Sequence, residues 1–211
     1  MSREEAIKAI EVGIDTVAEL KEKGYNVFAT GEMGIGNTTT SSAVCSVLLD
    51  QSVEKVTGKG AGLTNKDLEH KIEVIKQSIA LNQVDANDPI DVLSKVGGLD
   101  IAGMVGCYIG GAALQVPVFI DGFISSVAAL IAIRLIPECA PYLFPSHCSN
   151  EPAGHLILDA IGKEPYILAN MCLGEGTGAV MGFTIADYAF KAYWELPSFE
   201  QTNFGTYEEL N

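Results

Sequence analysis

Residues Val116 to Ile136 read VPVFIDGFISSVAALIAIRLI, and this is the segment of the chain that most resembles a membrane span. Pro117, Asp121 and Arg134 interrupt it, so its unbroken apolar part is too short to cross ~30 Å of hydrocarbon. A buried strand that ends at the acid, followed by a buried helix over 123–135, fits the pattern better. The segment therefore predicts a strand–helix unit rather than a membrane anchor.

The same alternation continues on both sides of this unit. Thr64 or Asn65 can cap a helix that runs to about Leu81, and Gly97 ends a short helix. We expect further helices over about 7–23, 38–49, 100–115 and 156–161, and one that follows GEGTGA (174–179) and runs to about Trp194. Extended segments are expected over 25–29, in the stretch after residue 140, and over 166–173. Short apolar strands that alternate with helices are typical of a parallel α/β sheet, which binds ligands at the carboxyl ends of its strands.

Composition limits the class of protein. The chain has 211 residues, 48% of them apolar and 19% charged, which indicates one globular domain, or one domain with a small appendage. Its formal charge is 13 − 27 = −14, so no basic surface is expected for nucleic acid or for an anionic membrane. Backbone N–H groups and a single lysine can still bind one phosphate.

The cysteines and the N-terminus indicate a cytoplasmic location. There are five cysteines and no C-x-x-C pair, which argues against a disulfide framework or a zinc knuckle and for a reducing compartment. The first twenty residues are charged early and lack the apolar core of a signal peptide.

The glycine-rich stretch Gly31–Thr40, GEMGIGNTTT, lies between a short strand and a helix. Gly34 and Gly36 let the backbone approach a ligand, and the threonines can begin a helix whose free N–H groups favour an anion. Asn37 and Thr38 stand where a Walker A loop needs lysine and a hydroxyl, and a dinucleotide fingerprint would need a further glycine. Because Glu32 would repel phosphate, we expect it to face another part of a ligand. A purely structural turn remains the alternative.

Two further acids follow predicted strands. Glu175 lies between Gly174 and Gly176, and Thr177 follows. A carboxylate in this position can accept a proton from a substrate in a closed site. Its alternative role is that of a turn or capping residue. Asp121 is either a substrate-binding acid at a strand end or stabilises the N-terminus of the helix that directly follows it.

The stretch SHCSNEPAGH, residues 146–155, holds His147, Glu151 and His155, three residue types that can bind metal. Their spacing matches no zinc motif, and Pro152 and Gly154 break any shared helical face. We therefore predict no metal here, and no motif supports a nucleophilic serine or cysteine.

Five segments in a fixed order carry a resemblance that no single loop does: GEMGIGNTTTSSA, KIEVI, VPVFIDGFISS, SHCSNEPAGH and LGEGTGA. Together they resemble the nicotinate-nucleotide–dimethylbenzimidazole phosphoribosyltransferases over essentially the whole chain. The resemblance implies a homodimer without a cofactor, with a Rossmann-like parallel sheet flanked by helices in a catalytic domain over 25–185. It also implies that 1–24 and 186–211 belong to a small helical domain.

The reaction that the resemblance implies transfers phosphoribose from nicotinate mononucleotide to 5,6-dimethylbenzimidazole, which gives α-ribazole 5′-phosphate and nicotinate. Glu175 would be the general base, and Glu32 would belong to the same site. Lys71 and Ser149 would lie near the phosphate, and Asp121 near the ribose or the leaving nicotinate. The other substrate-binding residues would be Gly34, Gly36, Asn37, Thr38, Gly174, Gly176 and Thr177.

Two departures leave an alternative open. Relatives are longer, and the part that would precede this chain completes the small domain and contributes to the azole pocket. Met171 and Cys172 stand before LGEGTGA, where an arginine is expected just before the leucine. The alternative is a domain that binds nicotinate mononucleotide without turnover, or a subunit that needs a second chain.

Overall fold

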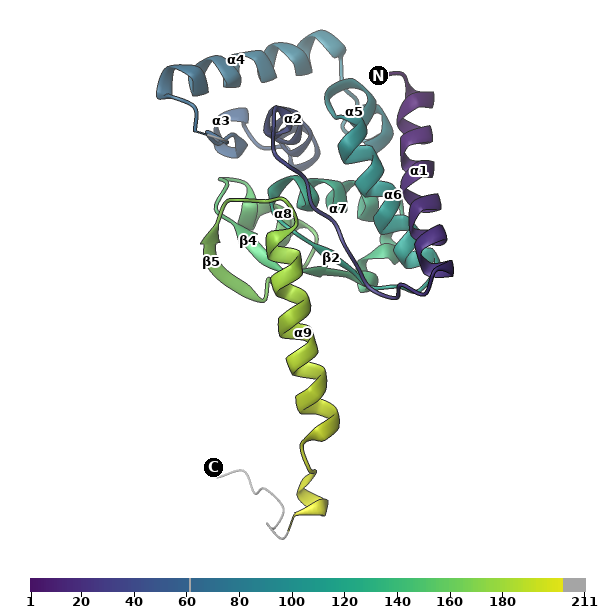
Figure 1. The fold of residues 1–211 in the computed structure, drawn as a ribbon. Helices are drawn as coiled ribbons and strands as arrows, with labels where there is room; N and C mark the ends of the chain where they lie inside the picture. The colour runs from purple at the N-terminus through teal and green to yellow at the C-terminus, as the bar shows by residue number, and fades with distance from the viewer. Residues whose placement is uncertain (61, 203–211) are drawn as a thin grey trace.

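The computed structural model describes residues 1–60 and 62–202, and it shows helices packed around parallel strands (Figure 1). The predicted acidic tail beyond residue 202 lies outside the described residues. The α-helices are α1 (Arg3–Glu22), α2 (Asn37–Leu49), α3 (Val53–Val56), α4 (Asn65–Asn82), α5 (Pro89–Val96), α6 (Leu99–Ala113), α7 (Phe123–Leu135), α8 (Gly154–Ala160) and α9 (Thr177–Glu195). The strands are β1 (Phe28–Ala29), β2 (Val118–Ile120), β3 (Leu143–Pro145), β4 (His147–Ser149) and β5 (Ile167–Met171), and 3₁₀ helices η1 and η2 cover Pro137–Tyr142 and Phe199–Gln201.

The strands form two small parallel sheets, which confirms the predicted α/β class. One sheet has the order β1–β2–β3, with Phe28 opposite Val118 and Val118 opposite Leu143. The second pairs β4 with β5. Since β1, β2 and β3 are parallel, their carboxyl ends meet at one edge, where the chain continues into the glycine loop, into Asp121 and into β4. This edge is where a ligand is expected in an open α/β sheet.

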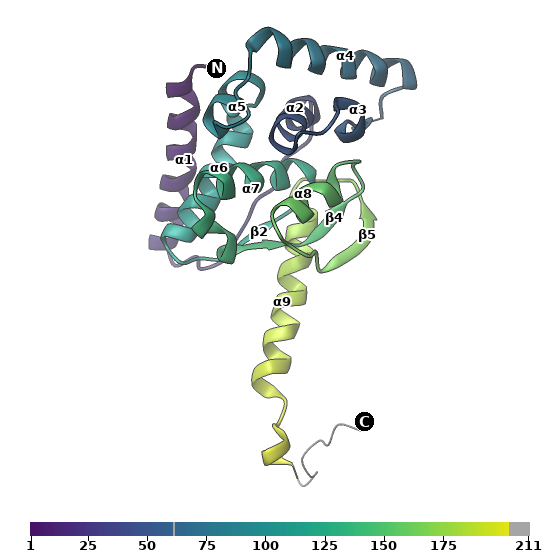
Figure 2. The same ribbon diagram turned by 180° about the vertical axis from the view of Figure 1, so that it is seen from behind.

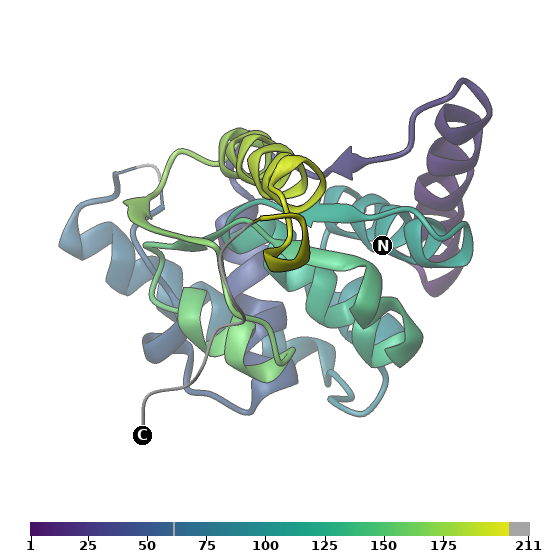
Figure 3. The ribbon, with the colours of Figure 1, turned by 90° about the horizontal axis from the view of Figure 1, so that it is seen from below.

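Helices cover both faces of the first sheet. Helices α6 and α7 pack on one face, and the first turns of α9 pack on the other, where α9 is seen nearly end-on in Figure 3. Val118 and Ile120 of β2 are fully buried, as are Val105 of α6 and Val127 of α7. The segment 116–136 is thus a central strand with its buried helix, as its sequence predicts. In the part of the chain that the structure describes, no helix is long and apolar enough to cross a membrane.

Local signals placed most helix ends correctly. Thr64 caps α4 through a reciprocal pair of hydrogen bonds with Asp67, and α5 ends at Gly97. Helix α8 begins at Gly154, two residues before the predicted start, and Gly154 packs against the backbone of Ser149, where a side chain would not fit. Helix α9 continues without a break through residue 185, and its outer half extends away from the body (Figure 2). The division into domains stays a prediction.

Helices α1 and α6 approach closely along a seam of glycines. A Cβ atom on Gly106 would lie 1.9 Å from the carbonyl oxygen of Ile10, and one on Gly13 would lie 2.1 Å from that of Gly103. Real side chains do not tolerate such distances to backbone atoms. The seam therefore fixes how the N-terminal helix docks on the core.

We expect the substitution Gly106→Ala to destabilise the protein by about 1–3 kcal/mol or more, because the added methyl overlaps the α1 backbone. Thermal unfolding followed by circular dichroism measures this. Gly103→Ala is a matched control in the same helix, since no atom lies within 4 Å of its added Cβ. That control gains helix propensity and should not lower the melting temperature. Equal melting temperatures for both variants would contradict the tight α1–α6 seam.

Candidate active site

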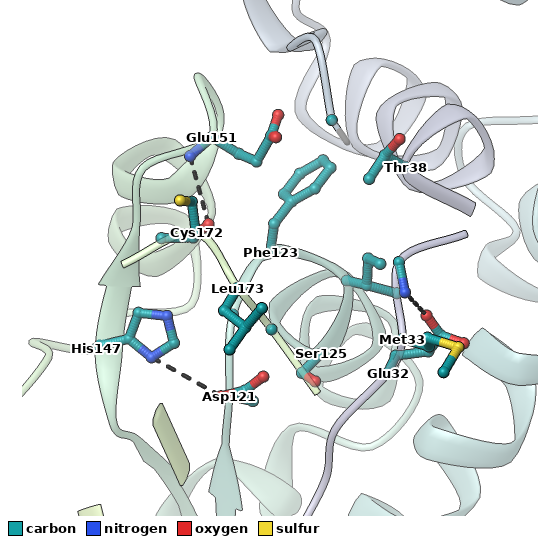
Figure 4. A pocket seen from close by; sticks show the side chains of 16 residues that line it. Glu32, Met33, Thr38, Asp121, Phe123, Ser125, His147, Glu151, Cys172 and Leu173 are labelled. Atoms are coloured by element: carbon teal, nitrogen blue, oxygen red, sulfur yellow. Dashed lines mark hydrogen bonds and ion pairs between the residues drawn. The ribbon is translucent and has the colours of Figure 1, made fainter. Parts of the chain in front are cut away.

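A cleft opens at the carboxyl edge of the strands, and Figure 4 shows the side chains around it. It is bounded by the loop after β1, the β2–α7 turn, the segment after β4, and the loop between β5 and α9. The residues that line it are Glu32, Met33, Gly34, Thr38, Gly60, Asp121, Gly122, Phe123, Ile124, Ser125, His147, Ser149, Glu151, Cys172, Leu173 and Gly174. Six of the predicted site residues therefore meet in one cleft: Glu32, Gly34, Thr38, Asp121, Ser149 and Gly174.

The two glycine-rich loops lie directly against each other. A Cβ on Gly31 would lie 2.4 Å from the Gly176 nitrogen, so only glycine fits between the two backbones. The Glu175 N–H donates to the Glu32 carbonyl at 2.9 Å. Glu175 itself has φ +60, a left-handed conformation that a glutamate adopts only when its surroundings impose it. Two glycine-flanked glutamates that are far apart in the sequence are thus held next to each other in space.

The two glutamates of these loops differ in what their side chains do. The Glu32 carboxylate lines the cleft and accepts the N–H of Gly34. The Glu175 side chain is exposed and does not line the cleft in this structure, although Gly174 beside it does. Catalytic groups in ligand-free enzymes often reach their final geometry only when substrate binds. The loop contact holds both acids at one edge of the cleft.

Asp121 caps the N-terminus of α9 rather than that of the helix that follows it. One carboxylate oxygen accepts the N–H groups of Gly178 and Ala179 at 2.8 and 3.1 Å, and the other accepts the N–H of Gly176 at 3.0 Å. The residue is 1% exposed. Three N–H donors directed at a carboxylate make a strong, charge-assisted anchor. Of the two roles left open by the sequence, this geometry favours helix stabilisation, here of a helix more than fifty residues further along the chain.

His147 stands beside this anchor. Its Nδ1 lies 3.1 Å from the Ser146 hydroxyl and 4.0 Å from the Asp121 carboxylate. Burial lowers the pKa of His147, and the charge of Asp121 opposes that shift. A Cβ on Gly178 would lie 1.9 Å from the ring, which explains why the α9 start carries glycine there. In the sequence, His147 is considered only as a metal ligand. A histidine at the start of a strand, between a serine and a cysteine, gives no indication of the contact with Asp121.

Lys71 reaches the Gly31–Thr40 stretch from α4, and its predicted place near a phosphate stays a prediction. Its Nζ donates to the Thr38 hydroxyl at 2.9 Å and to the Gly58 carbonyl at 3.0 Å, and the residue is only 7% exposed. Burial lowers the pKa of Lys71, and Glu151 opposes the shift. Thr38 is thus the point where this lysine meets the cleft.

The remaining predicted residues lie around this arrangement. Asn37, at the start of α2, donates to Asp100 of α6 and does not line the cleft. Gly36 and Thr177 also lie outside the lining, and the Thr177 hydroxyl donates to the Gly174 carbonyl at 2.7 Å. The Ser149 hydroxyl lines the cleft and accepts the Glu151 N–H at 3.3 Å.

Sequence reasoning did not find several of the lining residues. Phe123 and Ser125, at the start of α7, belong to a helix that reads as core. The sequence suggests Glu151 only as part of a metal set. Cys172, at the position where an arginine is expected, lines the cleft, so no cationic side chain enters from that side. In the described part of the chain, no group of three or more His, Cys, Asp or Glu side chains is placed to hold a metal ion.

Comparison with known proteins points to the same family as the five sequence segments do. A family model described as a phosphoribosyltransferase (DBI_PRT) matches residues 1–204. The nicotinate-nucleotide–dimethylbenzimidazole phosphoribosyltransferase of Ruminiclostridium cellulolyticum is 54% identical over 210 residues, which are 100% of this chain and 60% of that protein. The enzyme of the same name from Acetivibrio thermocellus is 53% identical over 99% of this chain and 59% of its own length.

A solved structure has the same fold. The crystal structure of CobT from Thermus thermophilus superposes with a TM-score of 0.91 at 30% identity, covering 97% of this chain and 61% of that one. The chain thus spans about 60% of the length of the curated relatives it matches. The family model, the identity to these relatives and the shared fold all agree with the motifs of the two glycine loops. The chain therefore belongs to the nicotinate-nucleotide–dimethylbenzimidazole phosphoribosyltransferase family.

Proposed function

We propose that this chain transfers phosphoribose from nicotinate mononucleotide to 5,6-dimethylbenzimidazole or a related azole, with α-ribazole 5′-phosphate and nicotinate as products. The observation that carries the proposal is the contact between the two glycine-flanked glutamate loops at the cleft edge. It brings the expected base, Glu175, next to a second acid and a helix N-terminus. Family membership adds the substrate class.

The chemistry requires one proton acceptor and little else. One nitrogen of the azole attacks C1′ of the ribose while its N–H proton leaves from the other nitrogen, and Glu175 takes that proton. The pyridine ring is cationic in the mononucleotide and departs as a neutral ring, so its departure needs no proton donor. Orienting the azole against C1′ supplies several kcal/mol of the rate gain.

In this proposal the phosphate binds at the Thr38 and Ser149 end of the cleft. The N-terminus of α2 and the hydroxyls of Thr38 and Ser149 offer donors there, Gly34 lets the backbone approach closely, and the Lys71 ammonium donates to the Thr38 hydroxyl from the side of α4. Glu32 lines the same cleft and faces the ribose and azole side. Asp121 keeps the Glu175 loop in place through its three backbone donors.

We also propose a homodimer in a reducing cytoplasm. The outer part of α9 carries a run of large apolar side chains that stay exposed in the described part of the chain: Ile185, Tyr188, Phe190, Tyr193 and Trp194. All five cysteines are free, in keeping with such a compartment. Light scattering after gel filtration measures the assembly, and a monomer at micromolar concentration would contradict the dimer.

A second candidate function is a module that binds the mononucleotide without turnover. It is favoured by the fact that the chain spans only about 60% of its curated relatives. Incubation with nicotinate mononucleotide and dimethylbenzimidazole, followed by chromatography for α-ribazole phosphate, separates the two. Product formation supports the transferase. Mononucleotide binding in calorimetry without azole binding or product supports the module.

A further inference from the structure

The cleft is acidic where the proposed function needs to hold an anion, and the inference below rests on that proposed function. Three carboxyl side chains line the cleft, those of Glu32, Asp121 and Glu151, while none of the described lining residues is lysine or arginine. A phosphate monoester carries about −1.5 to −2 charges at neutral pH. An ionised carboxylate beside it would weaken its binding.

Glu151 is the acid at the phosphate end of the cleft. Figure 4 shows Glu151 and Thr38 on the two sides of the Phe123 ring. The Glu151 Oε2 atom is buried and has no hydrogen-bond partner among the residues that the structure describes. It packs on Gly58, where an added Cβ would lie 2.0 Å from this oxygen, while the Gly58 carbonyl on the same residue accepts from Lys71. Burying a carboxyl oxygen that no donor contacts costs much more free energy when the acid is ionised than when it is neutral. The site therefore favours the neutral form of Glu151.

The surroundings of Glu151 favour its neutral form when an anion arrives. Burial raises the pKa of Glu151, and the charge of Lys71, with an N–H of Gly60, opposes the rise. An incoming phosphate would raise this pKa further, because like charges disfavour ionisation. Other titratable groups around the cleft are Glu32 from the β1–α2 loop, Asp121 after β2, His147 of β4 and Cys172 after β5.

We propose that Glu151 binds the phosphate of the mononucleotide as a neutral carboxyl, donating its O–H to a phosphate oxygen. The proton comes from solvent when the ligand binds, and it returns to solvent when the ligand leaves. Glu151 is then a substrate-binding residue that selects for a phosphorylated ligand, and Lys71 supplies the neighbouring positive charge. Mononucleotide affinity falls as pH rises, by up to about tenfold per pH unit once free Glu151 is ionised.

Calorimetry at neutral pH in two buffers of different ionisation enthalpy counts the protons taken up. For the wild-type chain we expect uptake of roughly one proton per nicotinate mononucleotide and none with nicotinate riboside, which lacks the phosphate. Glu151→Gln keeps a donor but cannot titrate, so its uptake should fall to what the phosphate itself contributes and its affinity should lose most of the pH dependence. Glu164→Gln, an exposed acid between α8 and β5, is the matched control and should behave as wild type.

Two results would overturn this role for Glu151: binding of the mononucleotide without proton uptake, or equal uptake in wild type and Glu151→Gln. If Glu151→Gln fails to fold, proton uptake by the wild-type chain with the mononucleotide, compared with the riboside, decides the question. If the wild-type chain does not bind the mononucleotide at all, that result also counts against this role for Glu151. This experiment measures binding and not turnover, so its outcome is independent of the proposed transferase activity. A chain that forms no α-ribazole phosphate can still take up the proton, and an active transferase can bind the mononucleotide without proton uptake.

Discussion

Replacing Glu175 with glutamine is expected to lower the rate of α-ribazole phosphate formation by about 10²- to 10⁴-fold. Glutamine fills the same space and keeps the backbone N–H that donates to Glu32, so the loop contact survives. What disappears is the group that, in the proposed mechanism, accepts the azole proton. The measurement is the single-turnover rate with nicotinate mononucleotide and dimethylbenzimidazole.

The control for this experiment is again Glu164→Gln, which removes an exposed carboxylate away from the cleft and should leave the rate unchanged. Mononucleotide affinity should stay within about threefold of wild type in Glu175→Gln, because the proposal has the lost group act on the azole and not on the mononucleotide. A rate equal to that of wild type would show that Glu175 is not the base. The acid to test next would be Glu32, which already lines the cleft.

The substitution Asp121→Asn is expected to lower the free energy of unfolding by about 2–4 kcal/mol, because hydrogen bonds to a buried charged group are strong. The amide keeps one acceptor oxygen and turns an N–H₂ group toward a backbone N–H. Gly176, Gly178 and Ala179 would then share a single partner. Chemical denaturation followed by fluorescence or circular dichroism measures the loss.

Activity separates the two roles left open for Asp121. If it positions the Glu175 loop, kcat should fall while the affinity for nicotinate mononucleotide changes little. Thr177→Ala is the matched control, since it removes one neutral hydrogen bond, to the Gly174 carbonyl, and should cost only about 1 kcal/mol. Unchanged stability together with weaker mononucleotide binding would instead make Asp121 a direct ligand contact.

Much of the fold could be predicted because its signals are local. The cap at Thr64 and the stop at Gly97 act through residues one turn away. The strand before Asp121 could be recognised because a short apolar run ending in an acid and a glycine fits few other structures. The start of α8 at Gly154 was missed, since it depends on an approach to the Ser149 backbone that no local pattern encodes.

The sequence could predict that some of the candidate residues lie close together, but not which contacts they make. The motifs placed Glu32, Thr38 and Ser149 in one site, and the structure brings them to one cleft. The hydrogen-bond partners of Asp121 lie 55 to 58 residues further along the chain, so no sequence pattern near Asp121 predicts them. Likewise the burial of one Glu151 oxygen depends on Gly58, which belongs to a different loop.

Cys172 makes this cleft accessible to thiol chemistry. It is exposed at the cleft edge, whereas the other four cysteines are wholly or partly buried. Burial raises the pKa of Cys45 to about 12 and that of Cys139 to about 11, which keeps those thiols unreactive near neutral pH. A maleimide dye should therefore attach at Cys172 first, without any engineered cysteine. Its labelling rate, slowed by whatever fills the cleft, would report ligand occupancy directly.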